Sequence, residues 1–237
     1  MRYLKGSTLE GSTLEGNTLA LVAWSVVVAG GAGIRFGSLK QFSSLGGHPV
    51  VFWSLKNALA VCQGAVVVVP AEFVDQFDTP PNTIVTAGGE TRADSVRRGL
   101  AKVPDNVEII VVHDAVRPLA SVSLFKLVIE AVERGADGAI PGLAVTDTIK
   151  HQANNKVIST INREELVVSQ TPQAFNASIL RLAHQNQPEA TDDASLVENC
   201  GGTVVVVPGE AKNIKITAPS DLKIAELLLG ESEDGLE

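Results

Sequence analysis

A glycine-rich loop with two basic residues is the first segment whose residue types could take part in a reaction. It reads AGGAGIRFGSLK, from Ala29 to Lys40, and follows an apolar run rich in valine. Glycines at the carboxyl end of a buried strand let backbone N–H groups approach phosphate oxygens. Arg35 and Lys40 add the positive charge that a transferred phosphoryl group requires. The loop therefore predicts an anion site with Arg35 and Lys40 as catalytic residues. The alternative is a glycine turn with two solvated cations.

Two common phosphate-binding loops are excluded by individual residues. The dinucleotide fingerprint needs a third glycine where this chain has Phe36. The P-loop needs a lysine directly after its last glycine, but Gly37 is followed by Ser38. The loop is therefore expected to bind its anion neither as a dinucleotide fingerprint nor as a P-loop.

A second glycine turn, AGGETRADS, runs from Ala87 to Ser95 and opens a predicted helix. Its backbone and the Ser95 hydroxyl offer donors and acceptors at the short reach needed to read the edge of a base. The alternative interpretation is a capped helix start in which Asp94 interacts with the helix dipole.

A carboxylate follows the run Glu108 to Val112, in the sequence HDAVRP. A carboxylate at the end of a central strand and beside a phosphate loop is a natural ligand for Mg²⁺. Asp114 is therefore the candidate metal ligand. His113 is expected to pack or to form hydrogen bonds within the fold, with no chemical role.

Apolar strands alternating with amphipathic helices must position these residues. Strands buried on both faces of a sheet read as continuous apolar runs. Such runs occur at 22–29, 65–69, 108–113, 138–143 and 203–207, with a shorter one at 84–86. Helices are predicted at 49–61, 91–101 and 220–229, and between Ser121 as N-cap and Gly135 as terminator. The repetition predicts an α/β fold, a Rossmann-like wound and mostly parallel sheet with helices on both faces.

One segment interrupts this alternation. The polar sequence HQANNK at 151–156 separates two short β-like runs at 146–150 and 157–161. The pattern predicts an inserted β-hairpin arm, at about 145–170. A projecting hairpin needs a partner to cover it, which favours a homodimer. A hairpin folded back on its own domain is the alternative.

Length and charge limit the remaining possibilities. The chain has 237 residues with 19 Lys+Arg and 27 Asp+Glu, a net charge of −8, so no broad cationic face is expected for nucleic acid or an anionic membrane. Cys62 and Cys200 are too far apart in sequence to suggest a disulfide framework or a zinc site, which fits a cytoplasmic location. The apolar stretch Leu19 to Ala29 is too short to span a bilayer.

The sequence is expected to divide into three parts. Residues 6–20 read GSTLE, GSTLE, GNTLA, and residues 1–20 are expected to be a flexible leader or a cloning scar. Residues 21–230 are expected to form one domain, followed by an acidic tail at 231–237.

Seven segments together resemble a known family, the 2-C-methyl-D-erythritol 4-phosphate cytidylyltransferases of the non-mevalonate isoprenoid pathway. They are AGGAGIRFGSLKQF, GGETRADSV, HDAVRP, DTIK, QTPQAF, TDDASLVE and NIKIT, in the family's order. The resemblance implies a nucleotidyltransferase that joins CTP to methylerythritol phosphate and releases pyrophosphate with Mg²⁺. It also implies a homodimer built by the β-arm.

The resemblance assigns roles to matching positions. It implies that Arg35 and Lys40 hold the triphosphate and that Lys215 approaches the transferred phosphate. For the remaining roles, the implied nucleotide-binding positions are Ala29, Gly30, Gly31, Gly89, Ser95 and Asp114, with Asp114 also at the metal. The implied substrate-binding positions are Arg117, Thr148, Arg163 and Thr171, with the arm arginine supplied across the dimer interface.

Three other functions stay open from the sequence. Gly30 and the segment NREELVVSQTPQAF also resemble the sister family that acts on ribitol 5-phosphate, whereas GGETRADSV and TDDASLVE favour the methylerythritol family. A pyrophosphorylase for another sugar, using UTP or GTP, would share the glycine loop. A non-catalytic nucleotide-binding regulatory protein is the alternative from another class.

Overall fold

The computed structural model describes residues 21–31, 39–185, 190 and 192–233, with only the backbone given for 231–233. The expected leader at 1–20, the loop segment with Arg35 and the end of the acidic tail lie outside these residues. Within the described part, no helix is both long and apolar enough to cross a bilayer.

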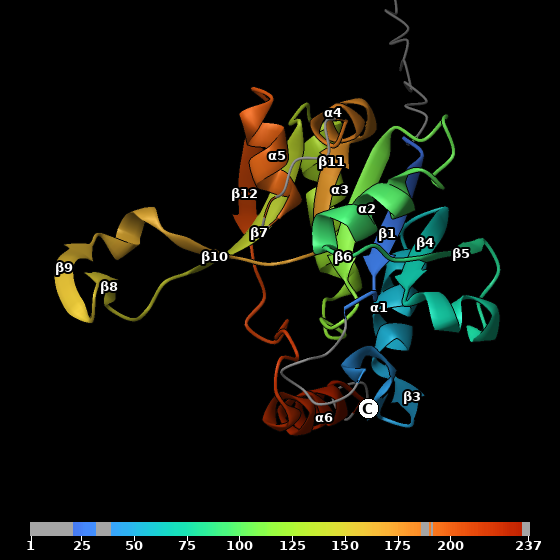
Figure 1. The fold of residues 1–237 in the computed structure, drawn as a ribbon, viewed down its shortest axis with the longest axis horizontal. Helices are drawn as coiled ribbons and strands as arrows, with labels where there is room; N and C mark the ends of the chain where they lie inside the picture. The colour runs from blue at the N-terminus through green and yellow to red at the C-terminus, as the bar shows by residue number, and fades with distance from the viewer. Residues whose placement is uncertain (1–20, 32–38, 186–189, 191, 234–237) are drawn as a thin grey trace, which may run out of the picture.

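A mostly parallel, eight-stranded sheet forms the centre of the molecule, as the sequence predicts (Figure 1). Along the sheet the strands are β5 (Thr83–Ala87), β4 (Gly64–Val69), β1 (Ala23–Val28), β6 (Ile109–Asp114), β11 (Gln173–Asn176), β7 (Gly138–Ala144) and β10 (Val167–Ser169), and β12 (Val204–Pro208) also pairs with β7. β11 is antiparallel to both β6 and β7, and β10 is antiparallel to β7. Every residue of β4 and β6 is buried, because helices cover both faces.

Two layers of helices enclose the sheet. α1 (Val50–Leu59) and α3 (Val122–Glu133) pack on one face, and α2 (Arg92–Leu100), α4 (Ala177–Ala183) and α5 (Asp193–Asn199) pack on the other. The expected caps are present: Ser121 Oγ accepts from Leu124 N at 3.0 Å, and Gly135, with a φ of 105°, follows the end of α3.

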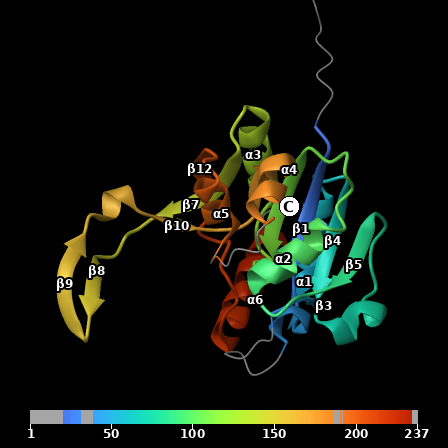
Figure 2. The ribbon, with the colours of Figure 1, turned by 45° about the horizontal axis from the view of Figure 1, so that its top comes forward.

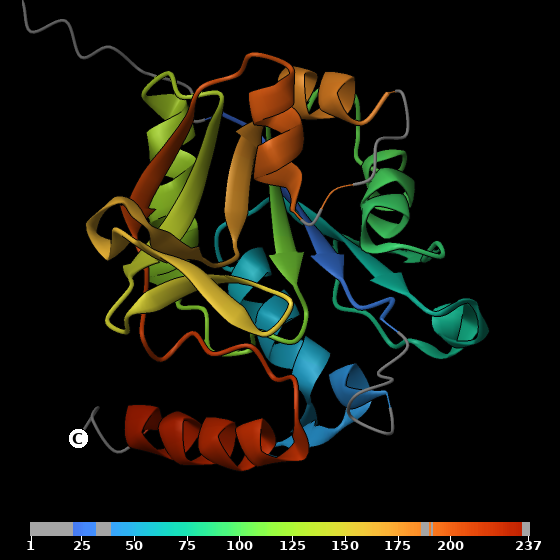
Figure 3. The ribbon, with the colours of Figure 1, turned by 60° about the vertical axis from the view of Figure 1, so that its left-hand side comes forward.

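A smaller cluster closes the lower end of the molecule. α6 (Pro219–Glu233) lies below the strands in Figure 3 and packs through Ala225 against Leu45 and Val50. β2 (Ser44–Leu45) and β3 (His48–Pro49) form a small hairpin in the same region, and three short 3-10 helices, η1 (Lys40–Phe42), η2 (Ala71–Gln76) and η3 (Arg163–Glu165), complete the described elements. The segment 213–217 leads from the sheet into α6.

The arm stands apart from the rest of the molecule (Figure 2). It consists of β8 (Ile149–Ala153) and β9 (Lys156–Ile161), which pair only with each other among the described strands. The turn is tighter than the expected 151–156, since Asn154 and Asn155 alone form it, with φ of 50° and 60°. Asn tolerates this left-handed conformation, and two such residues match the twist of a hairpin.

Candidate active site

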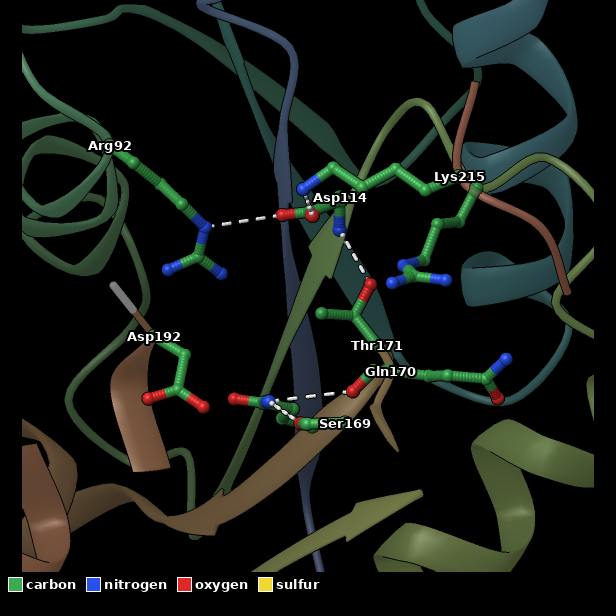
Figure 4. Close-up of a pocket in the computed structure, with 9 residues that line it drawn as sticks. Arg92, Asp114, Ser169, Gln170, Thr171, Asp192 and Lys215 are labelled. Atoms are coloured by element: carbon green, nitrogen blue, oxygen red, sulfur yellow. Dashed lines mark hydrogen bonds and ion pairs between the residues drawn. The ribbon is translucent and has the colours of Figure 1, made fainter. Parts of the chain in front are cut away.

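A cavity of about 150 Å³ opens at the carboxyl ends of the central parallel strands (Figure 4). Its lining residues are polar or charged and come from sequence positions more than 120 apart: Arg92, Asp114, Arg117, Ser169, Gln170, Thr171, Gln173, Asp192 and Lys215. Three cations and two carboxylates are among them. The cavity therefore suits an anion that also carries polar groups.

Asp114, at the end of β6, is held between two cations. Its carboxylate accepts from Lys215 Nζ at 2.7 Å and from Arg92 Nε at 3.2 Å. Burial alone would raise the pKa of Asp114, but Arg92 and Lys215 outweigh it and hold the pKa far below its usual range. Asp114 is therefore ionised at any physiological pH. The structure thus brings together two residues that the sequence singled out, Asp114 and Lys215.

Arg92 connects this cluster to a second, deeper carboxylate. Its Nη1 donates to Asp193 Oδ2 at 2.8 Å, and Asp193 Oδ1 lies 3.1 Å from Nε2 of the buried His184. Burial would lower the pKa of Arg92, but the two carboxylates outweigh it and raise the pKa. Arg92 is thus a fixed cation at the cavity wall.

Thr171 lies at the cavity but its hydroxyl is already engaged. Its Oγ1 accepts from Asp114 N at 3.0 Å and lies 3.1 Å from His113 Nδ1. His113 Nε2 contacts the carbonyl oxygen of Arg117 at 3.2 Å, which requires the proton on Nε2 and leaves Nδ1 to accept from Thr171. Burial lowers the pKa of His113 to about 4, so the ring is neutral. His113 therefore has the structural role that was expected.

The segment 213–217, called the strap below, is held by hydrogen bonds and positions Lys215. Arg117 Nη1 donates to the Asn213 carbonyl at 2.9 Å, and Asn213 Nδ2 donates to the Thr171 carbonyl at 2.9 Å. Gln170 Nε2 donates to the carbonyls of Glu210 and Asn213 at 2.9 and 3.2 Å. Ile216, next to Lys215, is fully buried. The backbone on both sides of Lys215 is thereby fixed.

The two glycine turns meet beside Ser95, as required of a shared nucleotide site. Ser95 is buried, and its Oγ accepts from Gly89 N at 3.1 Å. A Cβ on Gly30 would lie 3.2 Å from that Oγ and one on Gly88 would lie 3.0 Å from it, so a side chain at either position would crowd the Ser95 hydroxyl. Gln41 Nε2 donates to the Ala29 and Gly31 carbonyls at 2.8 and 3.1 Å, which holds the first turn.

Of the predicted catalytic and substrate-binding residues that the structure describes, three do not line the cavity within one chain. Thr148 and Arg163 lie on the exposed arm, where Arg163 Nη1 donates to the Thr146 carbonyl. Lys40 begins η1 and does not line the cavity. Arg35 lies outside the described residues.

Several residues of the cavity were not identified from the sequence. Arg92 lies within the quoted segment GGETRADSV, and Asp192 lies within TDDASLVE. The sequence did offer a sign of Asp192, because an Asp before a helical segment is typical of an N-cap. Its carboxylate accepts from Ser195 N at 3.2 Å. Gln170 and Gln173 lie within the quoted segment QTPQAF, directly after Ser169, but polar residues beside a short strand are common and gave no further signal.

Among the residues that line the cavity, Asp114 and Asp192 are carboxylates, the kind of ligand that Mg²⁺ prefers. No group of three His, Cys, Asp or Glu side chains suited to a metal occurs among the described residues. Mg²⁺ is commonly held by one or two carboxylates together with substrate phosphates and water. The ionised Asp114 at the cavity fits that pattern.

Comparison with known proteins identifies the family to which these features belong. A sequence model of the family IspD, 2-C-methyl-D-erythritol 4-phosphate cytidylyltransferase, matches residues 23–231. The chain is 40% identical over 217 residues to the 2-C-methyl-D-erythritol 4-phosphate cytidylyltransferase of Carboxydothermus hydrogenoformans, covering 86% of this chain and 93% of that protein. It is 39% identical over 220 residues to the bifunctional enzyme IspD/IspF of Lawsonia intracellularis, covering 84% of this chain and 55% of that protein.

The fold is also similar to solved structures. The crystal structure of the 2-C-methyl-D-erythritol 4-phosphate cytidylyltransferase from Thermus thermophilus matches with a TM-score of 0.73 and 32% identity, covering 86% of this chain and 97% of that one. The bifunctional protein from Campylobacter jejuni matches with a TM-score of 0.74 and 30% identity, over 85% of this chain and 53% of that one.

Proposed function

The chain belongs to the 2-C-methyl-D-erythritol 4-phosphate cytidylyltransferase family, and we propose that the Asp114 cavity and the adjoining glycine turns form its active site. The family reaction transfers a cytidylyl group from CTP to 2-C-methyl-D-erythritol 4-phosphate, a step of the non-mevalonate pathway. The cluster of Asp114, Arg92 and Lys215 carries the assignment, because it places fixed charge at the carboxyl end of a central strand, next to both glycine turns.

The two glycine turns would bind the nucleotide. The backbone of Ala29, Gly30 and Gly31 would approach the triphosphate, and Gly89 with Ser95 would read the cytosine. The 3.1 Å hydrogen bond from Gly89 N to Ser95 Oγ supports this proposal, because it fixes the Ser95 oxygen and leaves its proton free to donate. Arg35 and Lys40 would offset charge on the triphosphate.

The transfer itself needs no protein nucleophile. A phosphate oxygen of the acceptor attacks the α-phosphorus of CTP, the bond from that phosphorus to the bridging oxygen breaks, and pyrophosphate leaves. The acceptor phosphate is already ionised, so the barrier comes from repulsion between two anions and from alignment. Lys215, Arg92 and Arg117 would supply the counter-charge, with Lys215 nearest the transferred phosphate.

Asp114 is the residue that would hold Mg²⁺, together with phosphate oxygens and water. When bound, the ion supplies additional positive charge against the departing pyrophosphate. The low pKa of Asp114 supports this role, because the carboxylate does not need to lose a proton first.

The arm would complete the site of a second copy in a homodimer. Val157 and Ile158 on β9 are 65% and 59% exposed, which is unfavourable for apolar side chains unless a partner covers them. Thr148 and Arg163 lie on the same arm and away from their own cavity. We propose that they bind the methylerythritol phosphate across the interface, with Arg117 and Thr171 contributing from the cavity.

We also propose a cytoplasmic location. Cys62 is buried and Cys200 is exposed, and neither forms a disulfide. A reducing compartment keeps such thiols free. Titration of two thiols in protein isolated without reductant would support the proposal, whereas an oxidised Cys200 would contradict it.

Pyrophosphate release from CTP and Mg²⁺ tests the proposed function directly. We expect turnover with 2-C-methyl-D-erythritol 4-phosphate and little with ribitol 5-phosphate, UTP, ATP or GTP. Preference for ribitol 5-phosphate would assign the sister activity. Tight CTP binding without turnover on either acceptor would instead indicate a regulatory protein.

A further inference from the structure

The cavity has two chemically different sides. Arg92 and Lys215 converge on Asp114 at one side, whereas Asp192 and Ser169 lie below them in Figure 4. The first side offers cations to a phosphate. The second side offers hydroxyl, amide and carboxylate groups, which suit a ligand with hydroxyl groups. A phosphorylated alditol has one end of each kind.

Gln173 on the second side has an unsatisfied oxygen. The residue is 1% exposed, and its Nε2 donates to Ser169 Oγ at 3.1 Å and, more weakly, to the Gln170 carbonyl at 3.4 Å. Because a carbonyl oxygen only accepts, these contacts fix the amide orientation. Gln173 Oε1 is then buried with no partner in the described structure. Such an acceptor is unfavourable unless a ligand or water donates to it.

Gln173 is part of the wall of the cavity that also contains Asp114. Gln173 begins β11 and pairs in register with Val112 of β6, two residues before Asp114. A ligand phosphate held by Lys215 would therefore extend its carbon chain along a cavity wall that includes Gln173 and Asp192. Both offer acceptor oxygens, and a hydroxyl group is the part of an alditol that can donate to them.

We propose that Gln173 Oε1 accepts a hydrogen bond from a hydroxyl group of the acceptor alditol phosphate and thereby determines acceptor specificity. The proposal rests on the proposed cytidylyltransferase function. Sites built to bond a substrate hydroxyl discriminate strongly against analogues that lack it, because the protein group is left buried and unpaired. Gln173 begins β11 and lies outside the two glycine turns that would bind CTP, which meet at Ser95.

The test compares wild type with Gln173→Met, which keeps the side-chain length and removes the oxygen. We expect KM for 2-C-methyl-D-erythritol 4-phosphate to rise about 10-fold to 100-fold, while KM for CTP changes less than about twofold. Gln76→Met in η2, outside the cavity lining, is the control and should leave both KM values unchanged. A structural defect would instead change both KM values together with the melting temperature.

A panel of acceptor analogues, each lacking one hydroxyl group, completes the test. Wild type should lose activity with one of these analogues. Gln173→Met should use that same analogue as well as it uses the full acceptor. Equal use of all analogues by wild type would overturn the proposal without any variant, so the test survives a variant that does not fold. An unchanged acceptor KM in folded Gln173→Met would also overturn it. Wild type that is inactive with CTP and the full acceptor would overturn the proposed function itself.

Discussion

At the scale of single residues, the cavity is organised by ion pairs that share partners. Arg92 contacts Asp114 and Asp193 at once, so its guanidinium is fixed before any substrate arrives. Such preorganisation favours a charged transition state, because no side chain must reorient during the reaction. Asp193 does not line the cavity and is therefore a positioning residue.

Removing the charge of Asp193 should weaken catalysis through Arg92. We expect Asp193→Asn to lower kcat/KM about 10-fold, since the substitution keeps the shape but weakens the 2.8 Å pair. Steady-state kinetics of Asp193→Asn, Arg92→Met and the double variant would measure the coupling. Non-additive losses indicate action through Arg92, whereas fully additive losses would contradict it.

Lys40 tests the glycine loop independently of the cavity. Lys40→Ala should lower turnover about 100-fold or more, because the residue would stabilise charge on the triphosphate. Its side chain is partly exposed, so the melting temperature should change little. Kinetics and thermal unfolding of the same sample would check this, and undiminished turnover in the folded variant would remove Lys40 from the mechanism.

At the scale of elements, the strands that are buried on both faces can be identified from the sequence. Strands that mix polar and apolar residues are missed. The continuous apolar runs at β4 and β6 leave no alternative pattern, and their bounds agree with prediction within one residue. β11 was missed because QAFN is short and begins and ends with polar side chains. Its place between β6 and β7 depends on tertiary pairing, which local periodicity does not encode.

The site shows the same division. Asp114 and Lys215 were predicted from their segments, but they are 101 residues apart, and only the folded sheet and strap bring them within 2.7 Å. Arg92 and Gln173 were not predicted, because their roles depend on the contacts of one side-chain orientation. Local composition thus indicates the kind of ligand, and tertiary contacts determine which residues meet it.

The strap that carries Lys215 should affect turnover as well as stability, because its hydrogen bonds hold Lys215 in place. Asn213→Ala removes the 2.9 Å hydrogen bond to the Thr171 carbonyl and leaves that carbonyl buried. We expect the free energy of unfolding to fall by about 1–3 kcal/mol. Turnover should fall further than this alone explains, because Lys215 loses its fixed position. Urea unfolding and kinetics would check both, and a stability loss with normal kcat would contradict the positioning.

The arm provides a test of the shared active site by subunit mixing. Arg163→Ala disables the arm, and Lys215→Met disables the cavity, so each variant alone should be nearly inactive. If the arm serves the partner's cavity, mixed dimers contain one complete site, and random mixing restores about a quarter of wild-type activity. If the arm served its own cavity, mixing would restore none, and a monomer by sedimentation would contradict the arrangement altogether.

At the scale of the whole molecule, the neutral His113 links the site to the stability of the sheet. The ring packs against Phe125, with ring centroids 5.0 Å apart, and bonds to Thr171 beside Asp114. Its pKa falls from 6.5 in the unfolded chain to about 4 in the fold because burial disfavours the charged ring. Between these pH values the unfolded state therefore binds one more proton than the native state.

Stability should consequently fall with acid over that window. The proton bound by the unfolded chain lowers the free energy of unfolding by about 3 kcal/mol between pH 7 and pH 4, and the contribution is fully present above pH 6.5. Urea unfolding at several pH values would measure the slope. His113→Asn should be less stable at pH 7 yet lose this part of the slope, whereas His48→Asn, which removes an exposed histidine, should keep it. Equal slopes for wild type and His113→Asn would show that His113 takes up its proton in the folded state, and the buried hydrogen bond from Thr171 to Nδ1 could not then persist below pH 6.5.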